Sequence, residues 1–272
     1  MASGATRSGR DVPTSALFVF VLLTAAITWG IAGGYIFFPK QATALFGAME
    51  GAHPLYFIAT WGPGIAGIVL VLAYGGRDGL RAFMSRLLLW RSAAQWWLLT
   101  LVGLPLVFMA GSLIKGGQLL APMEDGAGQL FVLAIIMLFL GPVEEFGWRG
   151  VAQPILQRHV APVWAGAIIG AVWGVWHLPA FYLSGTVYAD WNFPLFLVGT
   201  ITMAILVTPM FNAARGSLLL PVAFHWQLII PFWPDAQPWD TWILVAVLAP
   251  VLWLCRDTMF SRDGAVTEVI PG

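Results

Sequence analysis

Charged residues are scarce in this chain. Lys and Arg number 13 and Asp and Glu number 13 in 272 residues, so only 10% of the chain is charged and the formal net charge is zero. In soluble domains roughly a quarter of the residues are charged. This chain therefore has too few charged residues to form the water-facing surface of a soluble protein. The lack of a basic run excludes a nucleic-acid partner. The single cysteine, Cys255, excludes an intrachain disulfide framework and a zinc site built from cysteines.

Apolar residues dominate instead, at 59% of the chain with 15 Trp and a mean hydropathy of +0.82. Because about 20 apolar residues span a ~30 Å hydrocarbon core, the sequence predicts an all-α polytopic membrane protein in contact with the lipid bilayer. It would lie in the plasma (inner) membrane if the source is bacterial. We expect about eight transmembrane helices, at residues 16–38, 56–74, 96–114, 130–145, 162–182, 193–211, 217–232 and 239–254.

The basic residues predict the orientation, because Lys and Arg collect in cytoplasmic loops. With eight helices and both termini cytoplasmic, 11 arginines fall on the cytoplasmic side and two lysines on the other. The expected organisation is a cytoplasmic tail at 1–15, a single transmembrane domain at 16–255 and a cytoplasmic tail at 256–272. We expect both tails to be polar and mobile. The first helix is too long for a signal-peptide core and should remain as an anchor.

Ionisable residues inside membrane helices are rare and usually functional, and here they are Glu144, Glu145, Arg149, His177 and His225. If residues 130 to about 158 form one helix and 162–182 the next, Glu144 and His177 lie at the same depth and can face each other. The glycines at 166, 170 and 174 share the face of His177. This ridge of small residues would let a neighbouring helix approach closely enough for a contact through one water.

Spacing divides these residues into two groups. Glu145 and Arg149 are four residues apart and share a helix face, so we expect them to form a supporting ion pair. Glu144 points elsewhere and is free to deprotonate a water, with histidines to hold that water and stabilise an oxyanion. Trp173, one turn before His177, would wall the pocket. Two histidines and a glutamate could also hold zinc, although the H-E-x-x-H motif is absent.

Three segments carry a resemblance to a known family. They are EEFGWRG at 144–150, WGVWHLP at 173–179, and RGSL at 215–218 leading to His225. The first two are similar to the E-E-x-x-x-R and F/W-x-x-x-H motifs of the type II CAAX prenyl endopeptidase and bacteriocin-processing family, also called abortive-infection proteins. The third is similar to the family's r-x-S-l segment, which precedes a histidine. The similarity covers a protease-like core at residues 130–232.

The resemblance implies intramembrane proteolysis of a peptide or a prenylated protein substrate. Glu144 and His177 would activate water, and His225 would help to form the oxyanion hole. The family's substrates are cut on the cytosolic side in eukaryotic members. The family has been treated both as metalloproteases and as metal-free glutamate proteases, so the cofactor stays open. A divalent metal such as zinc would be held by Glu144, His177 and His225.

One residue departs from the family pattern. The segment usually reads H-x-x-x-N, and the position four residues after His225 is Ile229. Isoleucine cannot donate a hydrogen bond, and losing one oxyanion donor typically slows hydrolysis by about 10²- to 10³-fold. Gln227 lies on the opposite side of the helix. A second interpretation therefore stands beside the protease: a non-catalytic relative that acts as a bacteriocin-immunity, scaffold or binding protein.

Overall fold

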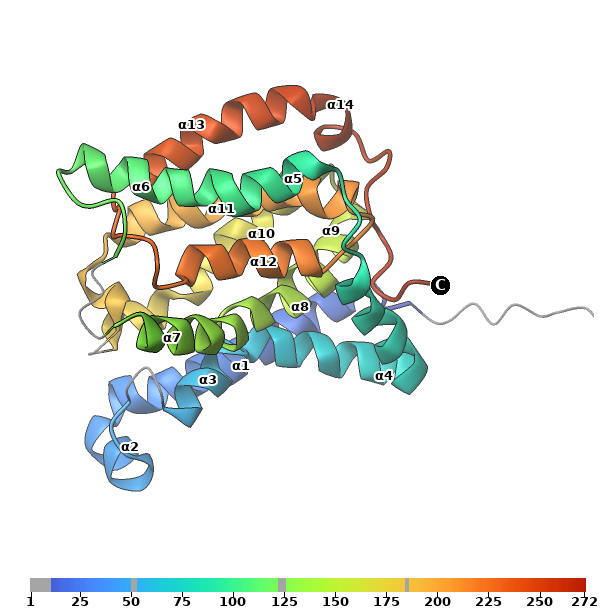
Figure 1. The fold of residues 1–272 in the computed structure, drawn as a ribbon. Helices are drawn as coiled ribbons and strands as arrows, with labels where there is room; N and C mark the ends of the chain where they lie inside the picture. Colours follow the sequence, from blue (N-terminus) through green and yellow to red (C-terminus); the bar gives the residue numbers. More distant parts are fainter. Residues whose placement is uncertain (1–10, 50–52, 122–125, 184–185) are drawn as a thin grey trace, which may run out of the picture.

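The computed structural model describes residues 11–49, 53–121, 126–183 and 186–272, and these residues are helical or irregular, with no strand among them (Figure 1). Five of the described helical segments are long and apolar enough to cross a membrane, at 16–37, 94–114, 128–157, 162–182 and 193–213. A sixth candidate is the bent pair of α3 (Pro54–Thr60) and α4 (Gly62–Met84), which meet at 61° and are apolar enough together to form a broken span or a re-entrant loop. Two shorter apolar helices follow, α12 (Leu219–Ile229) and α13 (Trp239–Leu254). The chain is an all-α polytopic integral membrane protein, as predicted.

The remaining elements are regular helices and short irregular turns. Three of the spans contain a single uninterrupted α-helix, namely α1 (Ala16–Phe37), α10 (Pro162–Trp176) and α11 (Phe193–Ala213). The third span is built from α5 (Ala94–Leu98), the π-helical turn η2 (Leu99–Gly103) and α6 (Leu104–Ile114). Short elements lie at the ends, namely α2 (Pro39–Phe46), η1 (Ser85–Leu88), η5 (Leu178–Tyr182), η6 (Val187–Asp190) and α14 (Arg256–Met259). Proline stands in the first turn of many of them, where its missing N–H has no helical partner to lose.

The outer surface of the bundle is apolar. Large side chains such as Phe18, Phe131 and Trp164 are 69%, 62% and 59% exposed. Water would disfavour so much exposed apolar surface, whereas hydrocarbon accepts it. These side chains therefore face lipid.

The fourth span is one helical segment at 128–157, close to the expected helix from 130 to about 158, but its helical geometry is interrupted. It consists of α7 (Ala127–Leu140), the 3₁₀ turn η3 (Pro142–Glu144), α8 (Glu145–Gly147), the π-helical turn η4 (Trp148–Ala152) and α9 (Gln153–Gln157). Pro142 causes the first break, because proline lacks an N–H and its ring clashes with the preceding turn. Such π-helical turns occur often at functional sites. The break lies immediately before the two glutamates.

The glycine ridge of α10 packs against α11, not against the span that carries Glu144, which corrects the predicted partner. A side-chain carbon added to Gly170 would lie 2.4 Å from the Ile201 Cα atom. Additions at Gly166 and Gly174 would meet Thr208 and Leu197 of the same helix. The ridge therefore fixes the α10–α11 pair, and another feature must bring Glu144 toward α10.

The basic residues gather at one end of the bundle. In Figure 1 the ends of α4 and α14 and the whole of α9 lie at the right, whereas α2 and the end of α6 lie at the left. We call the right end the arginine end; its described arginines are Arg77, Arg81, Arg86, Arg91, Arg158, Arg215, Arg256 and Arg262. The left end is the lysine end, with Lys40 in α2 and Lys115 after α6. Arg7 and Arg10 lie outside the described residues. The cytoplasmic location of the arginine end stays a prediction.

The last residues of the chain are held at the arginine end, so the expected mobility of this tail was wrong. Arg86 donates to the carbonyls of Glu268 and Val269 at 3.1 and 3.0 Å, and Arg158 donates to Thr267 O at 2.8 Å. The Asp11 carboxylate accepts from the backbone N–H groups of Val269 and Ile270. We call residues 266–270 the C-terminal segment.

Candidate active site

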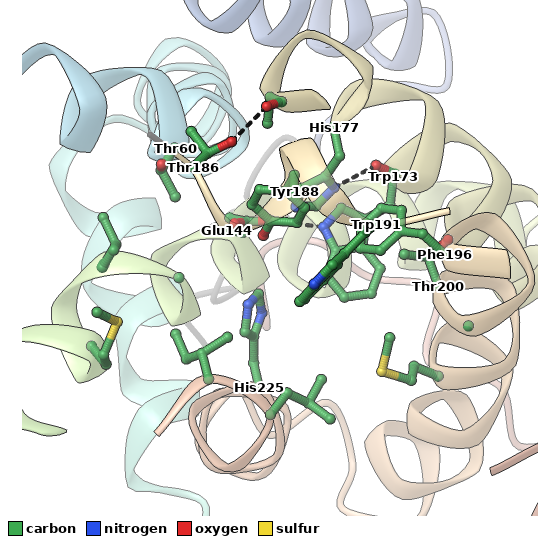
Figure 2. A pocket seen from close by; sticks show the side chains of 18 of the residues that line it. Thr60, Glu144, Trp173, His177, Thr186, Tyr188, Trp191, Phe196, Thr200 and His225 are labelled. Carbon is green, nitrogen blue, oxygen red and sulfur yellow. Dashed lines mark hydrogen bonds between the residues drawn. The ribbon is translucent and has the colours of Figure 1, made fainter. Parts of the chain in front are cut away.

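The candidate site lies on a cavity of about 800 Å³ among the helices. Glu144, Trp173, His177 and His225 all line it, and they come from η3, α10 and α12 (Figure 2). In Figure 2, His225 projects from α12 toward Glu144, and His177 lies on the far side of Trp173. The structure therefore brings the three predicted catalytic side chains to one cavity.

Glu144 is held by Trp173. The carboxylate is 2% exposed, and the Trp173 indole Nε1 donates to its Oε2 at 2.7 Å. Trp173 thus does more than wall the pocket as predicted, because it also fixes one oxygen of a carboxylate that lines the cavity. A hydrogen bond to an ionised group contributes about 1.5–3 kcal/mol. This bond, rather than close glycine packing, joins the broken span to α10.

His177 is oriented by its own helix. Its Nδ1 lies 2.9 Å from the Trp173 carbonyl oxygen, and because a carbonyl can only accept, Nδ1 carries the proton. The neutral ring then has its lone pair on Nε2. The ring packs edge-on against Trp176 at 4.6 Å between centroids and against Phe196 at 5.1 Å. His177 can therefore accept a proton at one defined atom.

Glu145 contacts two partners. Its Oε2 lies 3.4 Å from Arg149 Nε, which is the predicted ion pair, and its Oε1 lies 2.8 Å from His225 Nδ1. The contact with His225 was not predicted, because sequence spacing relates Glu145 only to residues of its own span. A carboxylate that receives the Nδ1 proton directs the other ring nitrogen, Nε2, and stabilises the protonated ring. Glu145 therefore positions His225 as well as pairing with Arg149.

Gly141 lets His225 and the broken span approach each other. A side-chain carbon on Gly141 would lie 2.8 Å from His225 Nε2 and 2.7 Å from Ile229 Cδ1. Ile229 therefore lies beside the ring nitrogen of His225, where the family pattern places an asparagine, and it lines the same cavity. Gln227 does not replace that donor, because it does not line the cavity; its side-chain oxygen accepts from Trp233 Nε1 at 2.9 Å.

An aromatic group over His177 was missed by the sequence analysis. Tyr188 lies 5.4 Å from His177 between ring centroids, and Trp191 and Phe196 pack against Tyr188. Burial raises the pKa of the Tyr188 phenol well above its usual value, with Tyr56 and Glu144 acting in the same direction. The phenol therefore stays protonated and can donate a hydrogen bond. The only sequence signal was the density of aromatic residues between 181 and 196.

A metal ion does not fit the side chains as they are arranged. Among the residues that the structure describes, no group of three His, Cys, Asp or Glu side chains gathers closely enough to hold one. The Nδ1 atoms of His177 and His225 have partners in Trp173 O and Glu145, so Nε2 of each ring is the atom that could act as a ligand. The observed arrangement of the described residues therefore does not bring three such side chains around one ion.

The site thus combines a buried carboxylate and two oriented histidines on one cavity inside a membrane domain. Residues 126–228 match the family described as type II CAAX prenyl endopeptidase Rce1-like. This match confirms the resemblance that the motifs predict, and its range includes Glu144, His177 and His225. Ile229 lies one residue beyond it.

A curated protein shows the same similarity. CAAX prenyl protease 2 from Methanococcus maripaludis is 25% identical over 146 residues, which are 49% of this chain and 54% of that protein. The alignment thus spans about half the length of the relative. Over this part the chain is similar to membrane proteases of the CAAX class.

Proposed function

We propose that this protein is an intramembrane endopeptidase that hydrolyses a peptide bond near a membrane-bound or lipidated segment of its substrate. The observation that carries the proposal is the Glu144 carboxylate, which lies inside a membrane span with one oxygen bound by Trp173 and lines a cavity with His177 and His225. The match of residues 126–228 to CAAX endopeptidases supports it.

In the proposed mechanism, Glu144 accepts a proton from a water molecule that His177 Nε2 helps to hold. The resulting hydroxide attacks the substrate carbonyl. The oxyanion that forms accepts a hydrogen bond from Nε2–H of a protonated His225. The Glu145 carboxylate balances the positive charge of this ring. The C–N bond then breaks, and the proton held by Glu144 passes to the leaving amine. Water is consumed, and a carboxylic acid and an amine are released. General base catalysis of this kind contributes about 10²- to 10⁴-fold.

The shape and polarity of the cavity favour an apolar substrate. Its walls include Met137, Leu140, Trp176 and Phe196, which would contact apolar side chains or a lipid group. The related protein from Methanococcus maripaludis is named a CAAX prenyl protease. We propose a peptide or prenylated protein as the substrate.

Ile229 favours the alternative of a non-catalytic binding protein. The isoleucine methyl occupies the place beside His225 Nε2 where a second hydrogen-bond donor would stabilise the oxyanion. A protein with the same cavity and an incomplete oxyanion hole could bind a peptide without cutting it, as an immunity or scaffold protein would.

The test is cleavage of a panel of prenylated and unmodified peptides by the detergent-purified protein. We expect wild-type cleavage of a panel member, loss of about 10²- to 10⁴-fold in Glu144→Gln, and no change in Asp78→Asn, whose side chain is 96% exposed at the arginine end. Addition and removal of zinc in the same assay tests metal dependence. Equal rates in Glu144→Gln and wild type would refute the assigned base. Tight peptide binding without cleavage would favour the binding protein.

A further inference from the structure

The described lining of the cavity extends toward one end of the molecule. From Glu144 and His177, its lining continues through Thr186 and Tyr188 to the loop at 231–237. These loops follow α10 and α12 at the left of Figure 1, at the lysine end. Among the described lining residues, none comes from the segments of the arginine end, namely 11–16, 75–93, 150–165, 207–220 and 255–272.

The arginine end is closed by packed protein. Three residues at this end are almost fully buried: Arg86 is 2% exposed, and Gln157 and Val269 are each 0% exposed. Gln157 Nε2 donates to Val266 O at 2.7 Å, and Arg86 Nη1 donates to Gly150 O at 3.3 Å. The C-terminal segment thus fills the space below the site, and a substrate arriving from this end would have to displace it.

Charge distribution indicates which end faces the cytoplasm. The described arginines gather at the arginine end, and the rule that basic residues collect in cytoplasmic loops places that end inside. The cavity would then open to the opposite, external side of the membrane. This differs from the cytosolic side that the family resemblance implies.

We propose that the substrate enters this cavity from the external face of the membrane. Of the two substrates proposed above, this selects a peptide, as an apolar segment exposed on that face, over a prenylated cytosolic C-terminal tail. The inference rests on the proposed hydrolysis, because it names the substrate of the same site. Asp190 and Asp235 stand exposed at the entrance, and an incoming segment passes them before it reaches the aromatic wall at Tyr188 and Phe196.

The proposal is tested by thiol labelling, which needs no catalysis. In a Cys255→Ser background, single cysteines are placed at the entrance (Asp190→Cys), inside the cavity (Thr60→Cys) and at the arginine end (Asp78→Cys). A membrane-impermeant maleimide is applied to right-side-out and to inverted vesicles. Ala180→Cys is a second cavity position that keeps the test valid if Thr60→Cys does not fold.

We expect Asp190→Cys and Thr60→Cys to react at least tenfold faster in right-side-out vesicles, and Asp78→Cys to react faster in inverted vesicles. Reaction of the cavity cysteine from the same side as Asp78→Cys would overturn the proposal, and so would reaction of Asp190→Cys from the cytoplasmic side. External labelling in a protein that cleaves no peptide would refute hydrolysis while leaving the access route in place.

Discussion

At the arginine end, polar side chains bind the chain's own backbone, whereas at the lysine end they face an open cavity. Arg86, buried at the first, donates to carbonyls of Gly150, Glu268 and Val269. Glu144 and His177 line the cavity at the second, and each has one atom held by Trp173. Buried polar groups whose hydrogen bonds are all made within the protein stabilise the fold. Buried polar groups that are held in place but keep hydrogen-bonding capacity can bind or activate another molecule.

Glu145 and Arg149 lie between these two regions. They are 3% and 1% exposed, and within the described part of the chain Arg149 Nε and Nη1 have no hydrogen-bond partner. Substitutions at the two ends should therefore separate stability from chemistry, and substitutions in this middle group should affect both.

The largest effect is expected for Arg149→Met. Removing one member of a buried ion pair costs about 3–5 kcal/mol, because the other charge stays buried without compensation, and Glu145 would then pair with His225 alone. We expect a lower yield of folded protein and a lower Tm in detergent. Unchanged yield and Tm with activity alone lost would instead assign Arg149 to the chemistry.

Arg86→Ala should break the closed end without affecting the site. Each carbonyl left unsatisfied costs about 1–3 kcal/mol, so we expect a lower Tm and rapid proteolysis of the C-terminal segment. The rate per folded molecule should stay the same, because Arg86 does not line the cavity. Arg81→Ala is the matched control, since the Arg81 side chain is 83% exposed. A lower kcat in the folded Arg86 variant would contradict the separation of the two ends.

Trp173→Phe should lower the rate of cleavage and leave stability nearly unchanged, which is the opposite of the effect expected for Arg86→Ala. The variant keeps the aromatic ring but removes the Nε1–H that donates to Glu144, a bond of about 1.5–3 kcal/mol, so cleavage should slow by roughly 10- to 100-fold in kcat with a small change in Tm. Trp164→Phe, at a lipid-facing position 59% exposed, is the control. A Trp173→Phe enzyme of wild-type rate would show that the bond does not orient the base.

The smallest effect is expected for Ile229→Asn, which adds a donor beside His225 Nε2. We expect a gain of about 10-fold, less than the ~10²- to 10³-fold that a fully aligned oxyanion donor provides. Val222→Asn introduces the same polar group on the same helix away from the cavity and should give no gain. If Ile229→Asn binds peptide more weakly and cleaves none, the isoleucine serves a binding cavity.

Sequence reasoning predicted most of the membrane domain because hydrocarbon permits few solutions. A long apolar run must form a helix in lipid, and an ionisable residue in such a run is conspicuous, so Glu144, His177 and His225 could be chosen without a structure. The ion pair of Glu145 with Arg149 followed from helical spacing alone.

Contacts between distant segments could not be predicted in this way. The bond between Glu145 and His225 joins residues 80 positions apart, and the break at Pro142 changed the direction of Glu144 relative to a regular helix. The glycines of α10 predicted that another helix packs closely against it, but they did not identify that helix. Tyr188 was missed because a tyrosine in a loop has no periodicity by which to recognise it.

The C-terminal segment also has a consequence for biogenesis. Arg86 enters the membrane domain early in synthesis, but two of its backbone acceptors lie 182 and 183 residues later in the chain. Until those residues leave the ribosome, the Arg86 guanidinium has only Gly150 among its described acceptors, and the Asp11 carboxylate has Arg158 as its partner. The arginine end is therefore completed late, after the spans that precede the C-terminal segment have been synthesised.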